Sequence, residues 1–243
     1  MTPRLHVAEA LVAGRRIALA PRAAHYLLRV MRRRPGDGVL VFNGRDGEWR
    51  GAIDEAGRRG CAVVLTERTR AQAPEDGPWL VLAPVKRHAL DLIARAATEL
   101  GVTRFVPVRT RNTVTVRIAL PRLAAIAIEA AEQCNRLTVP EWREPAELDA
   151  VLADWPSERR LFFCDEAGGG TPIAAALAGD GPWAVLIGPE GGFAEGERAA
   201  LRDHPAVIPV SLGPRILRTE TAAIAALACG QTLAGNWRGP QRR

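Results

Sequence analysis

The stretch WAVLIGPEGGFAEGERAALRDH, residues 183–204, holds a strand, a glycine-rich loop and a helix in immediate succession. Residues 183–187 are apolar and suit a buried strand, whereas residues 194–204 suit a helix. The glycines of the loop at 188–192 let backbone N–H and C=O groups approach a ligand closely. The loop follows neither G-x-x-x-x-G-K-[ST] nor G-x-G-x-x-G, so the usual phosphate and dinucleotide sites are not predicted.

A second loop of the same kind, SLGPRILRTET at 211–221, follows the next predicted strand, AVIPVSLG at 206–213. It leads into a helix over 219–235, which Thr219 can cap. Each loop alone is also compatible with a plain tight turn. Two such loops on consecutive strands favour a ligand site, because ligands of open α/β sheets bind where loops leave the carboxyl ends of strands.

The side chains of the second loop indicate what the ligand is. Ile216 and Leu217 beside exposed backbone suit a flat, neutral ring such as adenine better than a triphosphate. Arg215 and Arg218 predict a negatively charged partner on the same side.

Strands and helices alternate throughout residues 74–243, which predicts an α/β domain with a mainly parallel sheet. The expected strands are 79–85, 104–110, 160–166, 183–188 and 206–213. The expected helices are 90–100, 120–136, 171–179, 194–204 and 219–235.

Residues 1–73 differ from the rest and predict a small β-barrel domain. Short strands are expected at Val39–Phe42, Glu48–Ile53 and 60–69, and a short helix within 21–37 that Pro35 stops. The polar Pro/Gly stretch AQAPEDGP, residues 71–78, is the expected linker. We therefore expect two domains, 1–73 and 74–243.

The net charge of +6 is carried by the first domain. Residues 1–73 hold 14 Arg, no Lys and seven acids, a balance of +7, whereas residues 74–243 hold 19 basic and 20 acidic residues, a balance of −1. A bias toward Arg explains why Lys86 is the only lysine, but it does not explain this asymmetry. A basic module beside a neutral one predicts a polyanionic partner.

Cysteine and histidine usage predicts no metal site. The four cysteines form no C-x-x-C pair and the four histidines are scattered, so the cysteines are expected to be buried apolar residues.

The chain shows no secretory signal and no apolar run long enough for a membrane helix, and we expect it in the cytoplasm.

Motifs along nearly the whole chain resemble those of the bacterial 16S rRNA (uracil-N3)-methyltransferases, which belong to the SPOUT class. The two glycine loops carry the strongest likeness, and the motifs occur in the order of the family. They are HYLLRVMRRRPGD (25–37), VFNGRDGEWRGAI (41–53), ATELGV (97–102), IAIEAAEQCNRLTVPE (126–141), LIGPEGGFAEGE (186–197) and SLGPRILRTETAAIAAL (211–227).

The resemblance implies a PUA-like RNA-binding barrel over 1–73 and a knotted SPOUT methyltransferase domain over 74–243. It implies a homodimer that transfers a methyl group from S-adenosylmethionine to N3 of a specific uridine in 16S rRNA of the small ribosomal subunit. The implied S-adenosylmethionine contacts are Ile187, Gly188, Pro189, Glu190, Gly191, Leu212, Gly213, Pro214, Arg215, Ile216, Leu217 and Thr221.

Candidate catalytic and RNA-binding residues follow from the same motifs. Arg218 is expected to donate to a uracil carbonyl oxygen or a nearby phosphate, with packing against the last helix or pairing with Glu190 or Glu220 as its alternative role. Glu190 is expected to accept the N3 proton, or else to shape its loop. The expected RNA contacts, each of which could instead be a solvent-exposed residue, are Arg29, Arg32, Arg33, Arg34, Gln133 and Arg136.

Two other functions remain open on the sequence. A SPOUT enzyme that methylates a ribose 2′-hydroxyl would share the glycine loops, although the N-terminal barrel and the form PRILRTET favour the uracil enzyme. A non-catalytic rRNA-binding assembly factor would be expected to have degraded loops, and both loops are intact.

Overall fold

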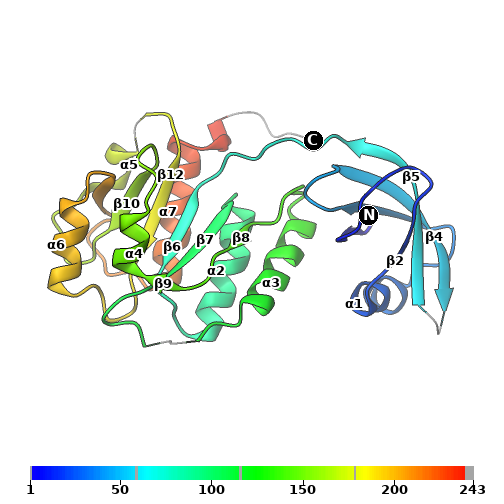
Figure 1. The fold of residues 1–243 in the computed structure, drawn as a ribbon, viewed down its shortest axis with the longest axis horizontal. Helices are drawn as coiled ribbons and strands as arrows, with labels where there is room; N and C mark the ends of the chain where they lie inside the picture. Colours follow the sequence, from blue (N-terminus) through cyan, green and yellow to red (C-terminus); the bar gives the residue numbers. More distant parts are fainter. Residues whose placement is uncertain (1, 58–59, 115–116, 178, 239–243) are drawn as a thin grey trace. The chain divides into compact units, whose positions relative to one another are not determined.

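The computed structural model describes residues 2–57, 60–114, 117–177 and 179–238 (Figure 1). The chain forms two compact units. The first comprises residues 1–75 and 131–139, and the second comprises 76–130 and 140–243. Residues 131–139, expected in the second domain, thus belong to the first.

The first unit is built on one sheet with the strand order β1-β3-β4-β5-β2. The strands β3, β4, β5 and β2 pair antiparallel, and β1 pairs with β3 in parallel. Buried Val39, Val41, Ile53, Val63 and Leu65 form its core. The strands are β1 (Arg4–His6), β2 (Arg16–Ala18), β3 (Gly38–Phe42), β4 (Glu48–Gly57) and β5 (Gly60–Arg70).

The helix expected to run up to Pro35 ends earlier. It consists of α1 (Pro21–His25) and a π-helical turn, η1 (Tyr26–Val30), whose Leu27 is fully buried. Arg32 adopts a positive φ of 53°, and the Arg33 N–H donates to the Leu27 carbonyl at 2.9 Å. A residue in the left-handed conformation, followed by a hydrogen bond to a carbonyl six residues earlier, ends the helix in the manner of a Schellman motif.

Residues 131–139 belong to the first unit because a buried arginine holds them there. The Arg4 guanidinium pairs with Glu48 at 2.6 Å and donates to the carbonyl oxygens of Ala131 at 2.8 Å and Arg136 at 2.5 Å. It also lies over the Phe42 ring, 3.8 Å from the centroid. Sequence periodicity could not show this, since the partners are far apart along the chain.

The second unit contains a parallel sheet with the order β11-β13-β10-β12-β6-β7-β8, and β9 also pairs with β7 (Figure 1). Its strands are β6 (Trp79–Leu82), β7 (Arg104–Arg109), β8 (Glu141–Trp142), β9 (Ala146–Glu147), β10 (Arg160–Cys164), β11 (Thr171–Pro172), β12 (Trp183–Ile187) and β13 (Val207–Ser211). Its helices are α2 (Arg87–Glu99), α3 (Leu120–Gln133), whose last residues lie in the first unit, α4 (Leu148–Ala153), α5 (Ile173–Ala176), α6 (Glu195–Asp203), α7 (Thr219–Leu233) and the short η2 (Asn236–Arg238).

Helices cover both faces of this sheet, as the alternation of its strand residues requires. Along β12, Val185 and Ile187 pack in one core with α2 and α7. Ala184 and Leu186 pack in the opposite core with α4 and α6. The strands are therefore buried on both sides, which explains their continuous apolar sequences.

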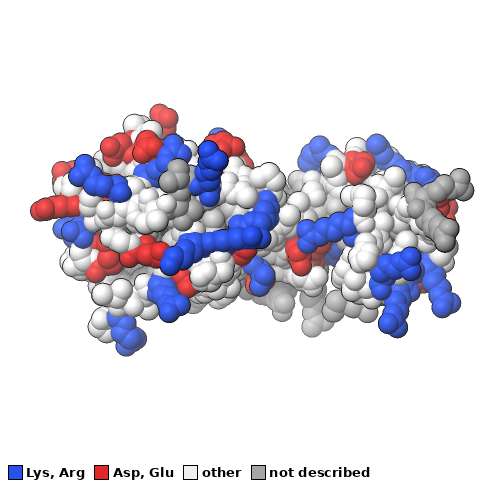
Figure 2. All heavy atoms as spheres, turned by 90° about the horizontal axis from the view of Figure 1, so that it is seen from below, with Lys and Arg blue, Asp and Glu red and all other residues white. Residues whose placement is uncertain are grey.

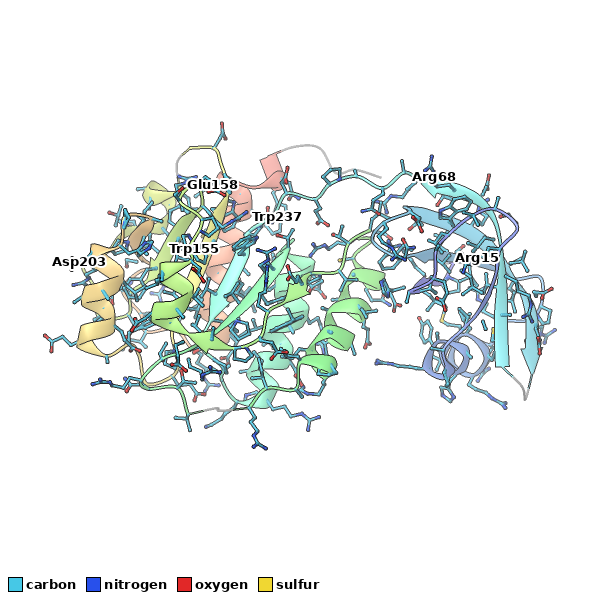
Figure 3. The ribbon with its side chains drawn as sticks, in the orientation of Figure 1. Arg15, Arg68, Trp155, Glu158, Asp203 and Trp237 are labelled. Atoms are coloured by element: carbon cyan, nitrogen blue, oxygen red, sulfur yellow. The ribbon has the colours of Figure 1, made fainter. Side chains whose placement is uncertain are left out.

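Aromatic and arginine side chains close the amino end of the sheet. Trp79, the first residue of β6, meets Trp155 edge-on with the ring centroids 5.7 Å apart, and Trp155 lies just beyond α4 (Figure 3). The guanidinium groups of Arg104 and Arg159 lie 4.1 Å and 4.0 Å from the centroid of the Trp79 ring. This end of the sheet is filled by side chains, so a ligand site is expected at the carboxyl end.

The contact between α7 and β12 leaves no room for a side chain at Gly230. A Cβ atom there would lie 2.1 Å from the ring of buried Trp183. We expect Gly230→Ala to lower the free energy of unfolding by about 1–3 kcal/mol through overpacking. Gly196→Ala on α6, where a Cβ meets nothing within 4 Å, should instead raise it by about 0.5–1 kcal/mol. Urea titration measures the free energy of unfolding of both variants. A change of the same sign and size in the two variants would contradict the prediction.

Candidate active site

A cavity of about 490 Å³ lies at the carboxyl end of the parallel sheet in the second unit. The loops that follow β6, β10, β12 and β13 all contribute to its wall. The lining residues are Lys86, His88, Ala89, Cys164, Glu166, Ile187, Gly188, Pro189, Glu190, Gly192, Ile216, Leu217, Arg218, Thr219, Glu220 and Ala222. The two glycine loops picked out from the sequence therefore meet at one site.

Glycine is required in the first loop for two separate reasons. At Gly188, directly after β12, a Cβ would lie 2.5 Å from the ring of Phe193, which is buried beneath the loop. At Gly192 the backbone has a φ of +67°, and its N–H donates to the Pro189 carbonyl at 2.9 Å. The loop is thus a tight turn packed on its own phenylalanine.

Neighbouring residues hold this turn through four hydrogen bonds. The Asn112 amide donates to the carbonyl oxygens of Gly191 at 3.1 Å and Gly192 at 3.0 Å. The Glu166 carboxylate accepts the Phe193 N–H at 3.1 Å. The Thr219 hydroxyl donates to the Gly188 carbonyl at 3.3 Å and so joins the two glycine loops.

The role expected for Thr219 is therefore wrong. Arg218 is the N-cap residue of α7 and its side chain makes no capping hydrogen bond, whereas Thr219 is the first helical residue. Its hydroxyl is turned toward the other loop rather than toward its own helix.

The cavity wall combines apolar surface with groups of both charges. Ile216 is 89% exposed although it is a large apolar residue, so a ligand ring could cover it. Lys86, His88 and Arg218 contribute basic side chains, and Glu166, Glu190 and Glu220 contribute acidic ones. Burial raises the pKa of the Cys164 thiol to about 12, so it is a neutral part of the wall and no thiolate nucleophile.

Comparison with known proteins identifies the family. Residues 75–231 match the sequence model of an RNA methyltransferase domain, and residues 19–66 match that of the RNA methyltransferase PUA domain.

The chain belongs to this RNA methyltransferase family. It is 31% identical to the ribosomal RNA small subunit methyltransferase E of Rickettsia conorii over 230 residues, which cover 93% of each chain. It is 30% identical to the protein of the same name from Synechocystis over 94% of this chain and 77% of the relative.

Solved structures of relatives agree with the fold. The ribosomal RNA small subunit methyltransferase E of Neisseria gonorrhoeae, bound to S-adenosylmethionine, is 29% identical with a TM-score of 0.86, over 97% of this chain and 99% of that one. A methyltransferase of Legionella pneumophila, also in complex with S-adenosylmethionine, is 28% identical with the same TM-score and coverage. The prediction of a SPOUT-class α/β methyltransferase domain with a small PUA-like N-terminal β domain is confirmed.

The cofactor residues predicted for this methyltransferase fall into two groups. Ile187, Gly188, Pro189, Glu190, Ile216 and Leu217 line the cavity, as does the predicted catalytic residue Arg218. The others are not among its lining residues. Leu212 packs against the core, Gly191 accepts from Asn112, and Gly213, Pro214, Arg215 and Thr221 are exposed.

Sequence reasoning missed the contributions from the loops after β6 and β10. Lys86 and His88 stand at the start of α2, and Glu166 follows β10. Both loops leave the carboxyl ends of strands that neighbour β12. The rule that places ligands at this edge of an α/β sheet could have found them.

The predicted RNA contacts of the methyltransferase lie in the first unit. Arg29, Arg32, Arg34 and Gln133 are exposed and Arg33 is half-buried. Arg136 differs, because it is 8% exposed and its guanidinium pairs with Glu75 at 3.0 Å. We therefore give Arg136 a structural role in place of an RNA contact.

Basic side chains outnumber acidic ones on the face of the first unit that Figure 2 presents.

For the ranges 2–57, 60–114, 117–177 and 179–238, no three His, Cys, Asp or Glu side chains form a group that could hold a metal ion. In the same ranges no helix is long and apolar enough to cross a membrane.

Proposed function

We propose that this protein transfers a methyl group from S-adenosylmethionine to N3 of a specific uridine in the 16S rRNA of the small ribosomal subunit. The observation that carries the proposal is that the two glycine loops meet at one cavity at the carboxyl end of the sheet. The names of the relatives support the small-subunit rRNA substrate, and the bound S-adenosylmethionine of two similar structures supports the donor. The choice of N3 as the acceptor atom rests on the resemblance of the six sequence motifs to those of the 16S rRNA (uracil-N3)-methyltransferases.

The cavity residues fit S-adenosylmethionine chemically. Ile187, Ile216 and Leu217 offer apolar contacts for an adenine ring, and the backbone around Gly188 can approach its edge. Glu190 offers a carboxylate to the positively charged end of the donor. When bound, S-adenosylmethionine supplies an electrophilic methyl carbon on a sulfonium centre.

The residues of the chain must then prepare the uracil. N3 carries a proton in the neutral imide, and it lies on the Watson–Crick edge, so the target base has to be unpaired or flipped out. Arg218 lines the cavity from the second glycine loop and is the proposed donor to a uracil carbonyl oxygen. Glu190 is the candidate acceptor for the N3 proton, and the apolar wall keeps water from weakening these charge interactions.

The first unit is the proposed RNA anchor. Arg29, Arg32, Arg33 and Arg34 are the proposed phosphate contacts, with Gln133 at the edge of the same unit. Contacts to phosphate position an RNA without reading its sequence. A ribosomal RNA substrate also makes the cytoplasm the expected location.

We further propose the trefoil knot and the homodimer of the SPOUT class for the second unit. The order β13-β10-β12 supports the knot, since β10 separates the consecutive strands β12 and β13, and α7 returns to pack on Trp183 of β12. Sedimentation equilibrium tests the dimer. A mass of two chains is expected, and a mass of one chain of 26.2 kDa would exclude it.

Asn112 provides a test of how the first glycine loop serves donor binding. Asn112→Ala removes both hydrogen bonds to the carbonyl oxygens of Gly191 and Gly192. At a typical net value of about 1–1.5 kcal/mol for such contacts, we expect the Kd for S-adenosylmethionine to rise about tenfold. Calorimetric titration measures this, with Asn236→Ala, an exposed amide in η2, as the control that should bind normally. An unchanged Kd of Asn112→Ala for S-adenosylmethionine would show that these two hydrogen bonds do not support donor binding.

Reverse transcription tests the acceptor atom. A methyl group on N3 blocks Watson–Crick pairing, so 16S rRNA treated with the enzyme and donor should stop the polymerase at one uridine. No stop is expected without the donor. A 2′-O-methyl product would pair normally, and strand cleavage by alkali would then be blocked at that nucleotide instead. That result would contradict methylation of uracil N3 and would show that the enzyme methylates a ribose 2′-hydroxyl.

A further inference from the structure

Lys86 occupies a distinctive position in this molecule. Among 33 Lys and Arg residues it is the only lysine, and it lines the cavity between β6 and α2. Its side chain is exposed to the cavity and the solvent. Within the part of the chain that the structure describes, its ammonium group has no ion-pair partner.

The cavity wall carries the cationic side chains of Lys86 and Arg218 together with the carboxylates of Glu166, Glu190 and Glu220. Lys86 and His88 approach from the start of α2, and Arg218 approaches from the second glycine loop. S-adenosylmethionine carries a sulfonium, an ammonium and one carboxylate, so it is itself a cation and needs at most one basic partner. The carboxylates suit this cationic donor, and at least one of Lys86 and Arg218 is left to meet an anion on the acceptor side.

The target uracil becomes such an anion during the reaction. The N3–H bond breaks, its proton passes through Glu190, the candidate acceptor, to water, and the electron pair stays on N3 with its charge spread over the two carbonyl oxygens. That electron pair then forms the N3–C bond as the S–C bond of the donor breaks, with the electrons of the S–C bond remaining on sulfur. A cation beside a carbonyl oxygen stabilises the anion more than the neutral base, and this difference is what accelerates a reaction.

We propose that Lys86 is a second catalytic cation, beside Arg218, that stabilises the uracil anion, an inference that rests on the proposed uracil methylation. An ammonium group suits this role because it is a compact charge on a flexible stem, whereas a guanidinium is a planar fork suited to phosphates and carboxylates. Arginine occupies all the remaining Lys and Arg positions of the chain, whereas the one lysine, Lys86, lines the cavity.

The experiment compares three variants on two RNAs. Lys86→Met removes the charge, Lys86→Arg keeps it, and Arg87→Met alters the adjacent exposed residue, which does not line the cavity. The RNAs are 16S rRNA made with uridine or with 5-fluorouridine and assembled into small subunits. Fluorine withdraws electrons and acidifies N3–H, so the modified base ionises with less help from the enzyme. Donor binding is measured separately by calorimetry.

We expect Lys86→Met to bind S-adenosylmethionine normally and to methylate uridine about 10²-fold more slowly near pH 7. Its rate should rise with pH to a plateau at higher pH than that of the unchanged enzyme, and its deficit should shrink on the 5-fluorouridine RNA. Lys86→Arg should lose less, and Arg87→Met should match the unchanged enzyme.

An equal deficit on both RNAs with an unshifted pH profile would overturn the proposal and indicate a phosphate contact instead. Loss of donor binding in Lys86→Met would overturn it in favour of a donor contact. Failure of the unchanged enzyme to methylate uridine would refute the proposed function itself, and the role of Lys86 with it.

Discussion

Arg218→Ala is expected to lower kcat for methyl transfer by about 10²–10³-fold, the usual cost of removing one donor that stabilises developing charge. Arg218 lines the cavity from the second glycine loop and immediately precedes α7. The Kd for S-adenosylmethionine should stay within a fewfold of its original value, because the glycine loops and their apolar residues are unchanged. Single-turnover rates with saturating donor, together with calorimetric titration, separate the two effects.

Arg215→Ala is the matched control for this prediction. Arg215 stands in the same loop and is exposed, but it does not line the cavity. Its loss should leave the single-turnover rate nearly unchanged. Equal deficits in the two variants would mean that the loop contributes only general positive charge, and no deficit in Arg218→Ala would remove it from the catalytic site.

Arg4→Met should be the most destabilising single change considered, with a loss of about 3–5 kcal/mol in the free energy of unfolding of the first unit. Arg4 and Glu48 are 8% and 4% exposed, and their ion pair is 2.6 Å long. Burial lowers the pKa of Arg4, and the hydrogen bond with Glu48 opposes that shift. Removal of Arg4 leaves the Glu48 carboxylate buried, with the Thr69 hydroxyl at 3.0 Å and the more distant Arg70 guanidinium at 3.8 Å. It also leaves the carbonyl oxygens of Ala131 and Arg136 without this donor.

Hydrogen exchange of amides in β3 and β4 over a urea series measures the loss for the first unit alone. Arg16→Met breaks a half-exposed pair with Asp54 at 2.8 Å and should cost less than about 1 kcal/mol. The double variant Arg4→Met/Glu48→Gln should recover part of the stability, because no charge is then left buried. A loss below 1 kcal/mol for Arg4→Met would show that residues 131–139 do not depend on this arginine.

The sequence predicts the five longer strands of the second unit well because their signals are local, but it does not predict the short elements β8, β9, β11 and α4. Each buried strand is a continuous apolar run, and the glycines at 188–192 stand where a strand passes into a loop. The rule that loops at the carboxyl ends of parallel strands share one edge then brings 187–190 and 216–218 to one cavity. The seven predicted residues that line it are all within these two segments.

The parts that sequence reasoning missed depend on contacts between distant residues. Arg4 reaches Ala131 and Arg136 across more than a hundred residues, so the place of 131–139 in the first unit has no local signal. The π-turn at Tyr26–Val30 ends a helix before Pro35 through the backbone of Arg32. Thr219 has the residue type of a helix cap, but the approach of Gly188 gives its hydroxyl another acceptor.

The most direct test of the account uses purified protein, S-adenosylmethionine labelled in its methyl group, and small ribosomal subunits from cells that lack this protein. The rRNA is digested and its nucleosides are separated by mass spectrometry. The account predicts label in 3-methyluridine from 16S rRNA, and far less with Arg218→Ala. Label on a ribose 2′-hydroxyl, or no binding of S-adenosylmethionine at all, would contradict it.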